Sequence, residues 1–198
     1  KMNELNKKLF IAFLIIFSLG MIALLVINTA TNSKIQDLSP KYDVPNFELT
    51  NFNGDIFTDN DLINKITIVS FIFTRCEGAC PIMSKNFRDL QTSFKDSDLV
   101  QFVSITVDPE YDSDSILKSF SNQYSNNDNW YFLRGDIVDI IELSEQGFKL
   151  SASLLPGGHS TQFVLVGQKK QIRKFYEGIV DANVMELQND IVTLINQG

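Results

Sequence analysis

The stretch ITIVSFIFTRCEGACPIMSKNF, residues 66–87, decides the fold. Its first part, residues 66–74, is a nearly continuous apolar run rich in β-branched and aromatic residues, which predicts a strand buried on both faces. Pro81 follows this run, and because proline is tolerated in the first turn of a helix, a helix is expected over residues 80–94. The only two cysteines, Cys76 and Cys80, therefore lie where a core strand passes into a helix.

Strands and helices alternate along the rest of the chain. The pattern predicts a hairpin over 45–58 turning at Asn53-Gly54, strands over 99–108, 129–135, 161–167 and 171–179, and helices over 113–124, 137–148 and 182–197. This alternation implies an α/β fold with a largely parallel centre. The place of the cysteines, and the late hairpin followed by a final helix, favour a thioredoxin-like sheet over a flavodoxin-like one.

The N-terminus carries an apolar segment, LFIAFLIIFSLGMIALLVI at residues 9–27, without a charged residue. As a helix it would span roughly 28 Å, close to the ~30 Å hydrocarbon core of a bilayer, so it predicts a transmembrane anchor. A cleaved signal peptide is the alternative, less favoured because the run exceeds the usual h-region and no clear cleavage site follows. We expect a cytoplasmic segment at 1–8, a linker at 28–44 and a globular domain at 45–198.

Charge narrows both the location and the partners. More lysines precede the apolar segment than closely follow it, which places the globular domain on the outer, periplasmic side of the membrane. The lack of an Arg-rich presequence favours a bacterial cytoplasmic membrane over a mitochondrial one. A net charge of −7 argues against nucleic-acid binding, which needs a surplus of Lys and Arg.

The cysteine pair has three possible uses. Its four-residue spacing puts Cys76 and Cys80 about one helical turn apart, so both sulfurs can face one side. The helix N-terminus beyond them favours thiolates, which serve both disulfide exchange and metal ligation. A purely structural disulfide is the third use, and it is less favoured because closing so short a loop removes little unfolded-state entropy.

His159, the only histidine, is the candidate third ligand. A lone histidine is often an ordinary surface residue, but a thioredoxin-like fold places the loop before this late strand beside the cysteine helix. Two thiolates and an imidazole favour Cu(I) or Zn(II) over hard cations. Structural zinc usually has four ligands, and the chain has no fourth Cys or His, so copper is preferred: Cu(I), or Cu(II) with added oxygen ligands.

With these motifs, the sequence resembles the Sco/SenC family, membrane-anchored copper proteins of thioredoxin-like fold that help to assemble cytochrome c oxidase. The resemblance covers roughly residues 42–197, and the anchor also matches. It rests on F-T-x-C-x-x-x-C-P at 73–81, V-D-P-E at 107–110 and H-S-T at 159–161.

The resemblance implies that Cys76, Cys80 and His159 are the copper ligands. It also implies a copper chaperone that delivers copper to the binuclear copper site of cytochrome c oxidase, or that reduces the cysteines of that site. The implied partners are the copper-site subunit of the oxidase and another copper carrier or thiol reductant. Asp108 is expected behind the ligands or at a partner contact, although a strand-ending turn explains it equally well.

One departure and one rival function stay open. Glu77 stands where many family members carry proline, and its carboxylate would slightly oppose thiolate formation while adding an oxygen near the metal. The rival is a membrane-anchored thiol–disulfide oxidoreductase that uses Cys76 and Cys80 alone. The spacing speaks mildly against it, because redox thioredoxins usually carry C-x-x-C.

Overall fold

The computed structural model describes residues 3–32, 37–125, 128–152 and 154–197. It divides into two compact units, residues 1–37 and residues 38–198. The first unit is helix α1 (Glu4–Asn32), in which the 19-residue stretch Asn6–Leu24 is apolar and long enough to cross a membrane.

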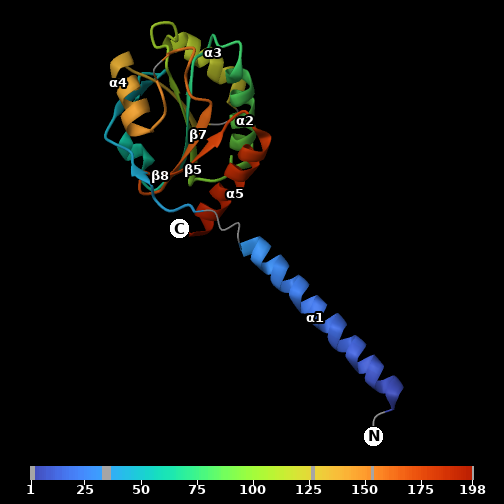
Figure 1. Cartoon of the computed structure of the whole chain (residues 1–198). Helices are drawn as coiled ribbons and strands as arrows, with labels where there is room; N and C mark the ends of the chain where they lie inside the picture. Colours follow the sequence, from blue (N-terminus) through green and yellow to red (C-terminus); the bar gives the residue numbers. More distant parts are fainter. Residues whose placement is uncertain (1–2, 33–36, 126–127, 153, 198) are drawn as a thin grey trace. The chain divides into compact units, whose positions relative to one another are not determined.

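The second unit is built on one eight-stranded sheet with the order β1-β8-β7-β4-β5-β6-β2-β3. Figure 1 shows strands of this sheet between helices that lie on its two sides. The strands are β1 (Tyr42–Asp43), β2 (Glu48–Asn51), β3 (Ile56–Thr58), β4 (Ile66–Ile72), β5 (Val100–Thr106), β6 (Trp130–Arg134), β7 (Gln162–Gly167) and β8 (Gln171–Glu177). The pairs β4–β5 and β5–β6 are parallel, and all other pairs are antiparallel. The predicted α/β class and parallel centre are confirmed.

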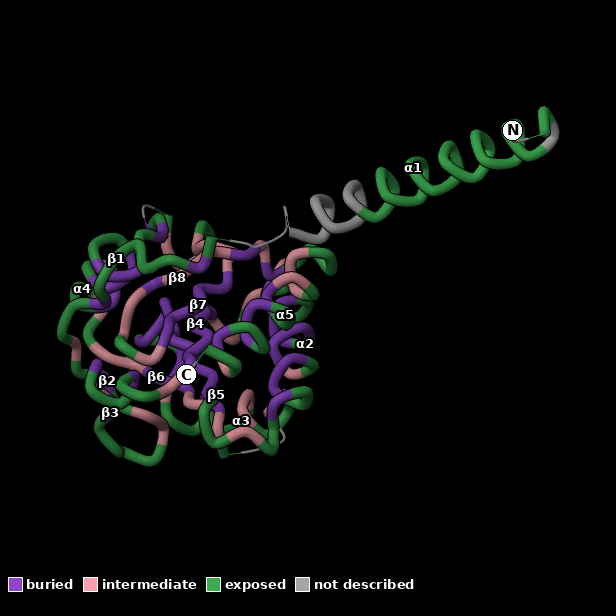
Figure 2. The backbone as a smooth tube through the Cα atoms, turned by 90° about the horizontal axis from the view of Figure 1, so that it is seen from below, coloured by how far each residue is buried: buried purple, intermediate pink, exposed green. Residues whose placement is uncertain are grey.

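Helices cover both faces of this sheet. They are α2 (Ala79–Ser93), α3 (Asp114–Tyr124), α4 (Ile137–Glu142), which continues into a π-helical turn η2 (Leu143–Gly147), α5 (Asp181–Gln197) and a short 3-10 helix η1 (Asp59–Leu62). One apolar core lies between the sheet and α2, α3 and α5, and a second lies between the sheet and η1, α4 and η2. All seven residues of β4 and of β5 are buried, as Figure 2 shows for the centre of the domain.

Helix α2 is fixed on the sheet by an apolar stripe that includes Met83, Phe87 and Leu90, spaced at about one helical turn. The ring of Phe87 lies 4.8 Å from that of Phe163 on β7 and 5.2 Å from that of Phe102 on β5. This packing holds the N-terminus of α2 beside the carboxyl end of β4, where the cysteines are.

The compact unit begins earlier than the sequence pattern indicates. Leu38 and Val44, which fall in the expected linker, are buried, and β1 pairs with β8. A two-residue strand is too short to produce a readable alternation, so the segment looked like a tether. The predicted helix over 137–148 is also shorter, because its second half widens into η2.

Candidate metal centre

The two cysteines belong to different local structures. Strand β4 ends at Ile72 and α2 begins at Ala79, so Cys76 lies in the loop between them, while Cys80 lies in the first helical turn. The predicted start of the helix near Cys80 is confirmed, since α2 begins at Ala79 after Gly78, its N-cap, and both sulfurs face one side as expected. Cys76 is half-buried, Cys80 is buried, and both are free thiols.

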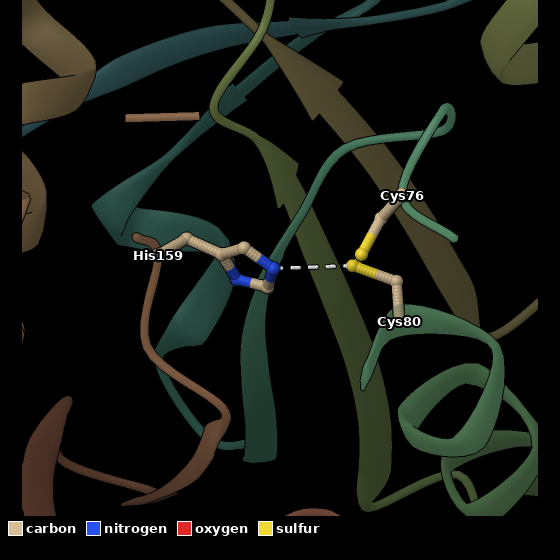
Figure 3. A group of neighbouring side chains, drawn as sticks. All are labelled: Cys76, Cys80 and His159. Atoms are coloured by element: carbon tan, nitrogen blue, oxygen red, sulfur yellow. Dashed lines mark hydrogen bonds between the residues drawn. The ribbon is translucent and has the colours of Figure 1, made fainter. Parts of the chain in front are cut away.

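Sheet topology brings His159 to this loop. Strand β7 runs antiparallel to β4, with Val69 opposite Val164, so β7 begins beside the carboxyl end of β4. His159 lies three residues before β7. It therefore contacts Cys80 although the two residues are 79 positions apart in sequence. Its Nε2 lies 3.1 Å from the Sγ of Cys80, and one ligand atom from each of the three residues lies within 4.8 Å of the others (Figure 3).

The imidazole is oriented by two neighbours. Its Nδ1 lies 3.0 Å from the carbonyl oxygen of Ser160, so Nδ1 carries the hydrogen and donates it. The ring of Phe73 stands edge-on to it, with centroids 5.2 Å apart. Burial lowers the pKa of His159, although the bond to Ser160 opposes that shift. The neutral ring thus keeps the lone pair of Nε2 aimed at the sulfurs, as a metal ligand requires.

The two thiols are tuned in opposite directions. Burial alone would raise the pKa of Cys76, but hydrogen bonds from the backbone N–H and thiol of Cys80 and from the N–H groups of Gly78 and Ala79 lower it overall. Burial raises the pKa of Cys80 to about 12. The expectation that the helix N-terminus favours thiolate at both positions is therefore wrong for Cys80, because desolvation of the anion outweighs the hydrogen bond from the backbone of Phe73 that lowers this pKa.

Asp108 and Glu77 lie outside the cluster of three ligand atoms. Asp108 is almost buried and accepts a hydrogen bond of 2.7 Å from Nε of Arg75, the residue before Cys76. The guanidinium of Arg75 also stacks on Tyr111, 4.7 Å from the ring centroid. Asp108 therefore contacts the cysteine loop and no ligand directly, while Glu77 is exposed.

Sequence reasoning missed Phe73 and Asp112 as neighbours of the site. Asp112 is fully buried and accepts hydrogen bonds from Thr74 and Thr106. The available signal was the D-P-x-x-D spacing after the second core strand, Asp108 to Asp112. That spacing places two carboxylates in one short loop at the end of the sheet where the cysteines are.

The donor set determines what the site can hold. Among the described residues, the cluster consists of two sulfurs and one imidazole nitrogen. Thiolate and imidazole suit soft or borderline metals, and three ligands leave a position open, unlike a closed four-ligand structural zinc site. Cys76 is half-buried, so its side of the cluster is partly exposed to solvent.

Comparisons with known proteins agree with this geometry. The family model described as SCO1/SenC matches residues 36–196. The SCO1 protein homolog of Bacillus subtilis (strain 168) is 32% identical over 157 residues, which are 76% of this chain and 81% of that protein.

Two solved structures share the fold. BsSco, described as having a disulfide switch and as a member of the Sco family of cytochrome c oxidase assembly proteins, matches with 31% identity and a TM-score of 0.70, over 79% of this chain and 95% of that one. Bradyrhizobium japonicum ScoI with copper bound matches in fold, with 22% identity and a TM-score of 0.65, over 77% of this chain and 99% of that one. The thioredoxin-like domain described above therefore belongs to the SCO1/SenC family.

Proposed function

We propose that this protein is a membrane-anchored copper carrier that holds one copper ion on Cys76, Cys80 and His159. It delivers this ion to the binuclear copper site of cytochrome c oxidase during assembly. One observation carries the proposal: two cysteine sulfurs and an imidazole nitrogen lie within 4.8 Å of one another beside the carboxyl end of the buried strand β4.

The chemistry of the three residues supports copper as the cargo. A three-coordinate metal with bonds of about 2.0–2.3 Å separates its ligand atoms by roughly 4 Å, so the cluster needs only small adjustments to bind one. Cu(I) accepts such low coordination and prefers thiolate sulfur. Cys80 gives up its proton when the metal binds, because the thiolate is the ligand.

The exposure of the site supports transfer rather than storage. Cys76 is half-buried and sits in a loop, so a ligand of the accepting protein can approach the ion from that side. Cys80 lies deeper, with Nε2 of His159 3.1 Å from its sulfur, and these two residues hold the ion while the exchange proceeds. Helix α1 supplies an apolar segment of suitable length for the membrane anchor, with the domain on the outer side.

Family membership supports the oxidase as destination. BsSco is described as an oxidase assembly protein, and ScoI of B. japonicum has been solved with copper bound. We extend both properties to this chain because its cysteines and histidine form one cluster suited to copper.

An anaerobic Cu(I) competition titration tests the proposal. The wild-type chain should bind one Cu(I) per molecule, and His159→Ala should weaken binding by more than the ~10–100-fold that loss of a ligand's supporting group typically costs. Ser160→Ala is the matched control, because it leaves the backbone carbonyl that His159 uses and should stay within about threefold of wild type. Equal affinities for wild type and His159→Ala would refute the three-ligand carrier.

A thiol–disulfide oxidoreductase is the second candidate, favoured by the asymmetry of the thiols. The Cys76 thiolate would attack a partner's disulfide, forming a mixed disulfide and expelling one partner thiolate. Cys80, once deprotonated, would then attack the Cys76 sulfur, release the second partner thiolate and leave a Cys76–Cys80 disulfide. The partner gains the two electrons that the pair loses.

The same variant separates the two functions. Disulfide reduction uses the cysteines alone, so His159→Ala should keep it while losing copper. Repeated turnover of a disulfide substrate with an external thiol reductant, at equal rates in wild type and His159→Ala, would favour the oxidoreductase. One turnover at most, together with tight copper binding by wild type, would favour the carrier.

A further inference from the structure

We propose that Asp112 is a positioning residue of the metal centre, which fixes the loop carrying Cys76 from behind. The inference rests on the proposed copper-carrier function and adds a residue to it. Among the described residues, the carboxylate of Asp112 accepts hydrogen bonds from two threonines and from none of the three ligands.

The carboxylate of Asp112 is buried, and hydrogen bonds must compensate for the loss of its hydration. Its relative exposure is 0%, and taking a carboxylate out of water is costly unless hydrogen bonds replace its hydration. Both of its oxygens are used: Oδ1 accepts from the hydroxyl of Thr74, and Oδ2 accepts from the hydroxyl of Thr106 and, at 3.2 Å, from the backbone N–H of Thr74. Such charge-assisted bonds are stronger than neutral ones.

These bonds join the cysteine loop to the neighbouring strand. Thr106 is the last residue of β5 and pairs with Ile72, the last residue of β4. Thr74 follows two residues after Ile72 and lies two residues before Cys76. Asp112 therefore ties the first part of the cysteine loop to the end of β5, at the point where the sheet no longer holds it.

The next residue of the loop is held from the same side. Arg75 donates to Asp108, whose own backbone carbonyl accepts the N–H groups of Tyr111 and Asp112, at 3.0 and 2.9 Å. The backbone N–H of Asp108 in turn donates to the hydroxyl of Thr106. The segment from Thr106 to Asp112 is thus internally hydrogen-bonded, and its carboxylates accept hydrogen bonds from Thr74 and Arg75, two successive residues of the cysteine loop.

This grip has a defined consequence for copper. Cys80 is held by α2, and His159 is held by the Ser160 carbonyl and Phe73, whereas Cys76 sits in the loop without a helix or strand. When the loop is released from Asp112, the Cys76 sulfur samples more positions in the copper-free protein. Copper binding must then fix this sulfur, and the lost conformational entropy weakens the affinity. Binding weakens and release speeds up, while the other two ligands stay in place.

The test uses the full chain in mild detergent and the variant Asp112→Asn, which keeps the size but removes the charge. Cu(I) affinity is measured by competition and copper release by transfer to a chelator in stopped flow. We expect about a 10–100-fold weaker affinity, the range typical of groups that orient ligands, mostly through faster release. We expect this partial loss of affinity rather than a complete loss because Cys80 and His159 keep their positions in the variant.

Asp190→Asn is the matched control for a loss of stability alone. Asp190 is also a buried carboxylate, and it accepts hydrogen bonds from Tyr176 at 2.6 Å and Lys174 at 3.3 Å. It lies on α5, outside the cysteine loop. This variant should lower the unfolding temperature as Asp112→Asn does, yet keep copper affinity and release within about twofold of wild type.

Thr74→Val covers the case in which Asp112→Asn does not fold. It removes one hydroxyl donor, keeps the backbone N–H bond to Asp112, and should weaken copper binding about threefold. Wild-type affinity and release in the folded variants, or an equal loss in Asp190→Asn, would overturn the inference. A wild-type chain that binds no copper would instead refute the proposed function, so the two failures are distinguishable.

Discussion

The buried thiol of Cys80 should make the folded, copper-free domain sensitive to alkali. Burial raises its pKa from 9.0 to about 12, so the folded chain holds this proton more tightly than the unfolded chain does. A raised folded-state pKa contributes stability that is fully present below about pH 9 and is lost as the pH rises toward 12.

The size of the effect follows from this shift. Three pKa units correspond to a ceiling of about 4 kcal/mol near pH 12. At pH 10 the unfolded thiol is mostly ionised and the folded thiol is not, so the loss relative to neutral pH is about 1.4 kcal/mol. Tyr176, whose pKa is raised by burial and by Asp190, adds a loss of the same sign above pH 10.

The assay is urea unfolding of the domain at pH 7.5 and pH 10 in reducing, copper-free buffer, comparing wild type with Cys80→Ala. Taking the change between the two pH values in each protein cancels the packing defect of the substitution and the contribution of Tyr176. Wild type should lose up to about 1.4 kcal/mol more than Cys80→Ala, reduced by the stability that wild type gains at high pH because the Cys80 thiol lowers the pKa of Cys76. Identical pH dependences would show that the Cys80 thiol is not held protonated by burial, and would refute the assigned asymmetry of the two thiols.

Three further substitutions probe the surroundings of the site. Phe73→Leu removes the edge-on contact with the His159 ring, worth about 0.5–1.5 kcal/mol, so Cu(I) affinity should fall about 2–10-fold. Phe148→Leu breaks a similar edge-on pair with Phe71 in the same core and should leave affinity unchanged. Equal affinities in the two variants would contradict an orienting role for Phe73. Asn86→Ala removes a buried side-chain amide that donates a hydrogen bond of 2.8 Å to the carbonyl of Gly178, so the free energy of unfolding in urea should fall by about 1–3 kcal/mol. An unchanged free energy of unfolding would contradict a stabilising role for this hydrogen bond. Glu77→Gln should leave affinity within about threefold and stability within about 0.5 kcal/mol, since Glu77 is exposed; a large loss of affinity would show that its carboxylate reaches the ion.

The central part of the fold was predictable because its sequence signals are long. Strands β4 and β5 are seven-residue runs of mainly apolar residues, and the helix that contains Cys80 begins at the expected place. The start of the compact unit was not predictable, because Leu38 and Val44 are single buried residues in a polar segment. The π-helical turn after α4 also leaves no pattern distinct from that of a longer helix.

The convergence of Cys76, Cys80 and His159 could be predicted from topology, since the antiparallel pairing of β7 with β4 carries the histidine to the cysteine loop. The opposite pKa shifts of the two thiols could not, because they depend on how deeply each sulfur is buried. The role of Asp112 was hidden for a similar reason. A carboxylate after a strand indicates a turn, and only the structure reveals that two threonines surround it.

X-ray absorption spectroscopy of the Cu(I)-loaded chain tests the central claim most directly. It should find one copper ion per chain with two sulfur neighbours and one nitrogen neighbour, and the nitrogen should disappear from the spectrum of His159→Ala. A copper ion with sulfur neighbours alone in the wild-type chain, unchanged by that substitution, would contradict the account.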